Sequence, residues 1–183
     1  MTTSRELGAV FATKTGAFEK LEGDLRGMSA AQAQYRPPEG AWSVAGVVEH
    51  LALVEGQLVQ LIATLLKRTE DAGKKAPAGS TFEITVEPFL ERSRREKYVT
   101  RDKFSPTGKM SMPDALKTLR EAHSSLQNLR PRLEQSDLSF ASFPHWIFGP
   151  LTLGQWLAFI GLHEERHLAQ IESIIASPAF PVR

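Results

Sequence analysis

Cysteine is absent from the 183-residue sequence. This absence excludes disulfide frameworks, thiolate zinc sites, iron–sulfur clusters and a cysteine nucleophile. Any bound metal must therefore be coordinated by histidine and carboxylate side chains. An excess of one charge is absent as well, because 22 Lys and Arg nearly balance 21 Asp and Glu, for a formal net charge of +1. Without a strong electrostatic field, we expect neither nucleic acid nor an anionic membrane as a partner.

The sequence also lacks a long uninterrupted apolar run. Residues 1–6 contain no apolar core of a secretory signal, and the most apolar stretch, residues 51–66, is interrupted by Glu55, Gln57 and Gln60. We therefore expect no membrane-spanning helix and predict a soluble, cytoplasmic protein. With 42% hydrophobic and 23% charged residues, the composition is that of a globular chain, and its length predicts one domain over residues 1–183.

Apolar residues recur with helical periodicity in four segments, which are residues 4–25, 43–67, 113–133 and 152–176. Ser43 and Thr152 are suited to capping the second and fourth segments, and Pro113 with Asp114 suits the first turn of the third. Ser29 is suited to capping a short turn after the first segment. The pattern predicts an all-α protein, a four-helix bundle.

A long irregular connection separates the second and third predicted helices. Residues 69–112 are punctuated by proline and glycine, which predicts a crossover connection rather than a simple hairpin. Within this connection, residues 81–86 have the pattern of an extended segment and residues 89–95 that of a short helix. No convincing sheet is predicted in the chain.

Two of the five histidines lie one helical turn apart. His163 and His167 have i, i+4 spacing on the fourth predicted helix, so both imidazoles lie on one face. The same face carries Trp156, Ile160, Ile171 and Ile174. In a dry interior each imidazole needs a polar partner of its own, and two separately satisfied core histidines are one interpretation. The other is a single divalent metal ion, which satisfies both rings at once.

A third ligand is expected from a facing helix, because bundles build metal sites from side chains on facing helices. His50 fits this expectation, since it lies among Val47, Leu51, Val54 and Leu58 on the second predicted helix. Three neutral nitrogens leave one or more coordination positions for water or substrate, which is typical of catalytic sites. A metal held in this way lowers the pKa of a bound water or binds a thiol as thiolate.

Further residues are candidates for catalysis or for the pocket. The string from His163 to His167 matches the H-E-x-x-H pattern of zinc proteases, in which the glutamate is the general base. Glu164 is therefore a catalytic candidate, with an ordinary helix carboxylate as the alternative. His145, in an aromatic loop before the fourth helix, is either a second catalytic candidate or a loop residue that caps backbone groups. The candidate pocket residues are Trp42, His123, Trp146 and Phe148.

Two blocks of the sequence carry a family signature. The first, residues 40–51, has Trp42-Ser43 ahead of His50, and the second runs from Phe148-Gly149 through Trp156 to His163-x-x-x-His167. In this order and at this separation, the two blocks resemble the DinB superfamily, more specifically its YfiT-like branch. The resemblance covers nearly the whole chain and is least supported in residues 69–112.

The resemblance implies a bundle of down-up-up-down style, with His50, His163 and His167 as ligands of nickel or zinc. It also implies frequent homodimers and, among family activities, sulfur transfer with bacillithiol, mycothiol or glutathione. We therefore expect a metal-dependent transferase or hydrolase that acts on a small molecule, with a low-molecular-weight thiol as a candidate cofactor. Two alternatives are a non-enzymatic metal-binding or stress-response bundle and an H-E-x-x-H protease. The protease would need a ligand beyond His167 and a sheet beside the helix.

Overall fold

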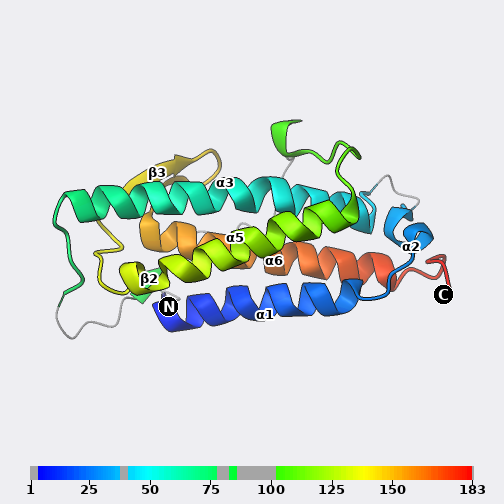
Figure 1. The fold of residues 1–183 in the computed structure, drawn as a ribbon, viewed down its shortest axis with the longest axis horizontal. Helices are drawn as coiled ribbons and strands as arrows, with labels where there is room; N and C mark the ends of the chain where they lie inside the picture. The colour runs from blue at the N-terminus through cyan, green and yellow to red at the C-terminus, as the bar shows by residue number, and fades with distance from the viewer. Residues whose placement is uncertain (1–3, 38–40, 78–82, 86–101, 183) are drawn as a thin grey trace.

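The computed structural model describes residues 4–37, 41–77, 83–85 and 102–182. Four long helices lie side by side along its longest axis (Figure 1): α1 (Leu7–Leu25), α3 (Val44–Asp71), α5 (Met112–Leu133) and α6 (Leu153–Ile175). In Figure 1, α1 and α6 run in one direction and α3 and α5 in the other. Because α3 and α5 are parallel, the connection between them must return along the length of the bundle. The predicted four-helix bundle with a long crossover is confirmed.

The helices begin where their capping residues predict. Ser43 Oγ accepts a hydrogen bond from the Gly46 backbone N–H at the start of α3. Thr152 forms a capping box with Gln155 at the start of α6. A second capping box, formed by Ser29, opens the short helix α2 (Ala30–Gln34). These caps fix where the two histidine-bearing helices start, and therefore which residues face the interior.

Within the described residues, two small antiparallel sheets accompany the bundle, so the expectation of no sheet was wrong for these segments. β1 (Ser4–Glu6) pairs with β2 (Glu83–Thr85), and β3 (Ser142–His145) pairs with β4 (Gly149–Thr152). Strands of three or four residues are too short to show a clear alternation in sequence. β2 confirms an extended conformation within the segment predicted at 81–86. The short helix predicted at 89–95 lies outside the described residues.

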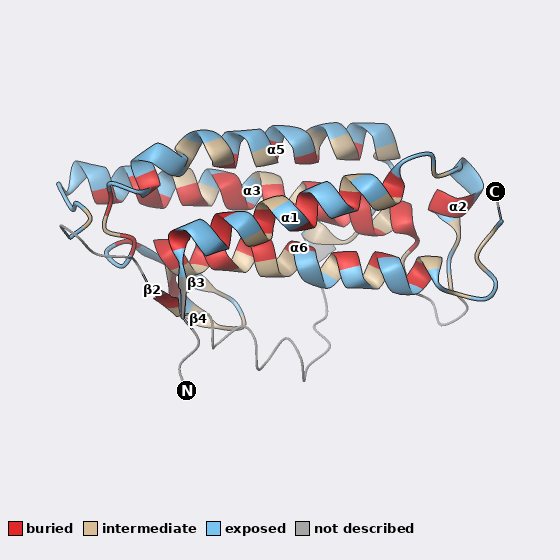
Figure 2. Cartoon of the chain, turned by 90° about the horizontal axis from the view of Figure 1, so that it is seen from below, coloured by how far each residue is buried: buried red, intermediate tan, exposed pale blue. Residues whose placement is uncertain are grey.

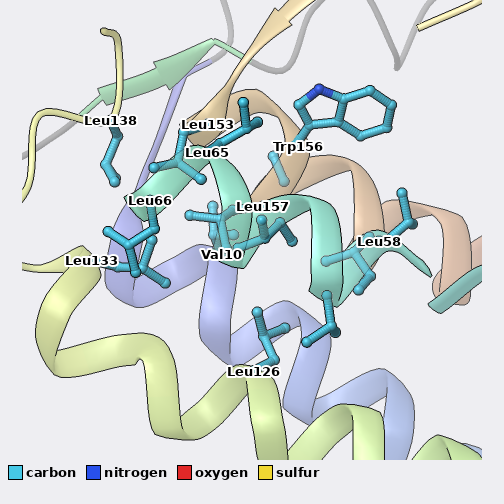
Figure 3. Packing of buried hydrophobic residues seen from close by; sticks show 14 of the residues in the cluster. Val10, Leu58, Leu65, Leu66, Leu126, Leu133, Leu138, Leu153, Trp156 and Leu157 are labelled. Atoms are coloured by element: carbon cyan, nitrogen blue, oxygen red, sulfur yellow. The ribbon is translucent and has the colours of Figure 1, made fainter. Parts of the chain in front are cut away.

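The apolar core forms two clusters, one toward each end of the bundle. Figure 2 shows the buried residues on the faces that the helices turn toward one another. The first cluster, part of which Figure 3 shows, includes Val10, Leu65, Leu126 and Leu157. The second includes Leu21, Val47, Leu119 and Ile171. All four long helices contribute to both clusters, and burial of each large apolar side chain stabilises the fold by about 1.5–3 kcal/mol.

Helix α3 is long and apolar enough, by length and composition, to cross a membrane. However, 61% of its most apolar window is buried inside the bundle. Burial of this extent is typical of the core helix of a bundle, which is apolar because it packs against the other helices. Among the described residues, no other helix has this length and hydropathy.

Candidate metal centre

Three histidines from two helices converge inside the bundle. His50 comes from α3, and His163 and His167 come from successive turns of α6. One ring nitrogen of each residue lies within 4.8 Å of the others. The Nε2 atoms of His50 and His163 are 3.3 Å apart. The structure thus brings together the three side chains that the sequence proposed as ligands, and their role in binding a metal stays a prediction.

Hydrogen bonds orient two of the three rings. His50 Nδ1 lies 2.8 Å from the Phe104 carbonyl oxygen, and His167 Nδ1 lies 2.9 Å from Gln170 Oε1. Both partners are carbonyl oxygens and can only accept, so each Nδ1 carries the proton and donates it. In the neutral ring the proton is then absent from Nε2, whose lone pair is available to a metal ion.

The third ring, His163, has a different environment. Its Nδ1 atom is buried and has no hydrogen-bond partner among the described residues. Burial, followed by the neighbouring His167 and His50, holds the pKa of His163 well below its ordinary value. Burial also lowers the pKa of His50, and it lowers that of His167 to about 4. All three imidazoles are therefore neutral at neutral pH.

This donor set fits a divalent cation. Neutral imidazole nitrogens are common ligands of zinc and nickel. If His50 and His163 both directed lone pairs at each other across 3.3 Å, they would repel unless a proton or a cation lay between them. A metal on the three Nε2 atoms removes that repulsion and requires His163 to keep its proton on Nδ1. The geometry therefore supports a three-histidine site more directly than it supports three independent core histidines.

Aromatic rings surround the histidines. The Trp42 ring centroid lies 5.0 Å from that of His50 and 6.4 Å from that of His167. On α6, the centroid of the Phe159 ring lies 5.6 Å from that of His163. Of the predicted pocket residues, Trp42 therefore lies directly beside the cluster. Apolar neighbours of this kind lower the local dielectric and strengthen electrostatic interactions at the site.

His145 lies at the centre of a second aromatic group, on β3. Its ring is 4.8 Å from Phe148 and 4.9 Å from Phe159, which links it to the histidine cluster. Trp146 follows at 6.2 Å and is 51% exposed. The backbone N–H of Ile147 donates to His145 Nδ1 at 3.1 Å, so the ring does cap backbone groups, as one interpretation expected. A catalytic role for His145 stays a prediction.

The remaining two candidates lie against α1. The His123 ring stacks on Phe18 with centroids 4.4 Å apart, so it belongs to the packing between α5 and α1. Glu164 is fully buried, and its carboxylate accepts a hydrogen bond from Lys14 Nζ at 2.7 Å. Lys14 also lies 3.0 Å from Glu55. A protease base must face the metal, whereas Glu164 faces Lys14, so the H-E-x-x-H string does not form a protease site here.

Sequence reasoning did not identify several residues of the site. Phe159 lies four residues before His163, so the same i, i+4 spacing that paired the histidines would have placed it beside them. Lys14 lies between Phe11 and Phe18 on the apolar face of α1, where a lysine needs a buried partner. Phe104 acts through its backbone carbonyl, for which the sequence carries no signal.

Comparison with known proteins agrees with the fold. The model of the DinB superfamily matches residues 15–171, which include all three histidines. The chain belongs to the DinB superfamily. The resemblance carried by the two sequence blocks is thereby confirmed.

Individual proteins are similar to this chain over most of their length. The uncharacterized protein YuaE of Bacillus subtilis is 27% identical over 152 residues, which are 82% of this chain and 88% of that protein. The crystal structure of TT2238, a four-helix bundle protein, matches with a TM-score of 0.60 and 22% identity, over 91% of this chain and 98% of the other. YfiT from Bacillus subtilis, described as a probable metal-dependent hydrolase of unusual four-helix bundle topology, matches with a TM-score of 0.59 and 17% identity, over 92% and 85% of the two chains.

The pKa shifts predict how the stability of this DinB-like chain without metal depends on pH. The three histidines have lowered pKa values, His167 about 4 against 6.5, so the free energy of unfolding should rise as the pH rises from about 4 to 6.5. Burial raises the pKa of Glu164 from 4.5 to about 8, so its contribution to stability should fall as the pH rises through this range. Burial also raises the pKa of Glu55, which acts in the same direction. The histidines are more numerous than the carboxyls, which places the maximum near pH 6.5. Urea unfolding of metal-free protein from pH 4 to 9 checks this prediction, which a maximum above pH 8 would contradict.

Proposed function

We propose that this protein is a metal-dependent enzyme in which His50, His163 and His167 bind one zinc or nickel ion. The convergence of three neutral ring nitrogens within 4.8 Å carries the proposal. Three protein ligands leave a coordination position for water or substrate. The description of YfiT as a probable metal-dependent hydrolase supports the same chemistry. We further propose a small-molecule substrate, a homodimer and a cytoplasmic location.

The reaction we propose is hydrolysis, or transfer of a group to a low-molecular-weight thiol. A bound divalent ion supplies Lewis acidity and lowers the pKa of a water or thiol. The protein holds two of the three imidazoles, those of His50 and His167, in the tautomer that exposes Nε2, through Phe104 and Gln170. Trp42 and Phe159 place apolar rings beside the histidines.

Metal binding is tested on protein purified without a histidine tag. We expect wild type to bind one equivalent of Zn²⁺ or Ni²⁺ by calorimetry and elemental analysis, and His163→Ala to lose this binding. A concentration of metal 1,000 times the Kd should add about 4.1 kcal/mol to the free energy of unfolding. His123→Ala is the matched control, because this histidine stacks on Phe18 outside the cluster. Wild type that binds no metal would contradict the proposal.

Turnover distinguishes an enzyme from a non-enzymatic metal protein. Metal-loaded wild type and His163→Ala are compared on a panel of activated esters, and on an electrophilic aromatic probe with bacillithiol, mycothiol or glutathione. Turnover by wild type that is lost in His163→Ala supports the enzyme. Stoichiometric metal binding without turnover of any probe favours the non-enzymatic alternative.

A further inference from the structure

The segment from Phe104 to Gly108 lies on α3 beside the candidate metal centre. It starts at the last residue of the 3₁₀-helix η1 (Asp102–Phe104) and precedes α5. Two adjacent residues of α3 bind it: Glu49 contacts Thr107 and Gly108, and His50 contacts Phe104. Neighbouring residues of a helix point about 100° apart, so the segment contacts α3 on two different sides.

Glu49 makes the stronger of these two attachments. Its side chain is only 3% exposed. The carboxylate accepts from Thr107 N–H at 3.1 Å, from Thr107 Oγ1 at 2.7 Å and from Gly108 N–H at 2.8 Å. Burial opposes ionisation, but the hydrogen bonds from this segment outweigh it and hold the pKa of Glu49 below its ordinary value. Glu49 is therefore an ionised group whose described hydrogen-bond donors come from residues 107–110.

The backbone of the segment is shaped for this contact. Gly108 has φ +71°, in the left-handed region that favours glycine. This conformation turns the chain after Gly108, so that the Met110 backbone also reaches the carboxylate that accepts from the N–H groups of Thr107 and Gly108. Phe104 lies three residues before Thr107, and its ring packs against the first core cluster. Its carbonyl oxygen is thereby held 2.8 Å from His50 Nδ1.

We propose that Glu49 is a positioning residue of the three-histidine site: it holds Thr107 and Gly108, and so keeps the Phe104 carbonyl on His50 Nδ1. The consequence is a fixed His50 tautomer, with the proton on Nδ1 and the Nε2 lone pair directed at His163. This inference rests on the proposed function, since a fixed tautomer matters when Nε2 must bind a metal. Groups that orient metal-ligating histidines typically change metal affinity tenfold to a hundredfold when they are removed.

Nitrogen-15 NMR of the histidine rings tests the proposal without any metal. The His50 signals are assigned by their loss in His50→Ala. We expect a single Nδ1–H tautomer for His50 in wild type and a mixture of tautomers in Glu49→Ala. In calorimetry, the Zn²⁺ affinity of Glu49→Ala should fall by about tenfold or more. Glu49→Gln keeps the shape of the side chain but loses one acceptor oxygen, so it should show a smaller change in the same direction.

The control is Val59→Ala, a buried position on α3 in the first core cluster. It should lower the melting temperature but leave both the His50 tautomer and the Zn²⁺ affinity as in wild type. An unchanged tautomer and affinity in Glu49→Ala would overturn the proposal, as would an equal loss of affinity in Val59→Ala. If Glu49→Ala does not fold, Glu49→Gln decides by the same criteria. If wild type binds no Zn²⁺, the proposed function fails, while the tautomer measurement still decides the role of Glu49.

Discussion

Replacing Lys14 with methionine is expected to lower the free energy of unfolding by about 3–5 kcal/mol. The Lys14 ammonium is 1% exposed and lies 2.7 Å from Glu164 and 3.0 Å from Glu55, both of which are 0% exposed. Burial lowers the pKa of Lys14, but the two carboxylates outweigh it and raise the pKa above its ordinary value. Methionine fills a similar volume but leaves Glu55 and Glu164 buried without a cation. Each must then either carry an unpaired charge or take up a proton, which burial already favours by raising the pKa of both. Urea unfolding at pH 7 measures the loss.

Two further variants isolate the cause of this loss. Lys20 lies on the same helix and also contacts two carboxylates, Asp24 at 3.0 Å and Glu172 at 2.7 Å, but it is 50% exposed. Lys20→Met should therefore leave stability almost unchanged, because solvent screens exposed pairs. Lys14→Met combined with Glu55→Leu and Glu164→Leu should recover most of the lost stability, since apolar residues of similar volume replace buried ion pairs at little cost. A Lys14→Met variant as stable as wild type would contradict this account.

The ion cluster lies between the two apolar clusters of the bundle. Lys14 falls between Phe11 of the first cluster and Phe18 of the second. α1 and α6 approach closely here: a Cβ added to Gly161 would lie 3.4 Å from the Lys14 backbone nitrogen. A buried lysine can find two carboxylates only when α1, α3 and α6 have the right register. The cluster therefore disfavours alternative packings of four similar amphipathic helices.

The bundle was predictable because its signals are local. Helical periodicity, capping by Ser43 and Thr152, and the i, i+4 pair His163 and His167 each depend on residues within a few positions of one another. The predicted helix boundaries agree with the structure to within about four residues. The strand at Ser4–Glu6 was missed because it is defined by its pairing with Glu83–Thr85, a contact between distant segments that leaves no local pattern.

The grouping of the three histidines was predictable, but the groups that orient them were not. The three histidines stand out because polar rings on an apolar face need a shared partner. Their orienting groups do not stand out: the Phe104 carbonyl is a backbone atom, and Glu49 is one of many helix glutamates. Glu164 was misleading in the sequence, because its position in an H-E-x-x-H string suggested catalysis. In the structure, Glu164 bonds Lys14 of α1, a contact between distant segments that the string does not show.

In the metal-free protein, His163→Leu is expected to raise the free energy of unfolding, by at most the roughly 1–3 kcal/mol that a buried polar atom without a partner costs. His163 Nδ1 is such an atom among the described residues. The long hydrogen bond between the Nε2 atoms of His163 and His50, at 3.3 Å, is lost in the variant and offsets only part of the gain. Leucine has a similar size and brings no polar group. The same variant should lose the stabilisation by Zn²⁺ or Ni²⁺, so the order of stability should reverse once metal is added.

His167→Leu is the matched control on the same helix. It should also lose stabilisation by metal, but it leaves the Gln170 amide without its partner, so the metal-free protein should gain no stability. Urea unfolding of wild type and both variants, first with a chelator and then with saturating metal, ranks their free energies of unfolding in each condition. An equal loss of metal-free stability in the two variants would show that His163 serves packing alone. A gain confined to His163→Leu would show that the chain retains an unfavourable buried imidazole at this position, as expected for a residue held ready to bind a metal.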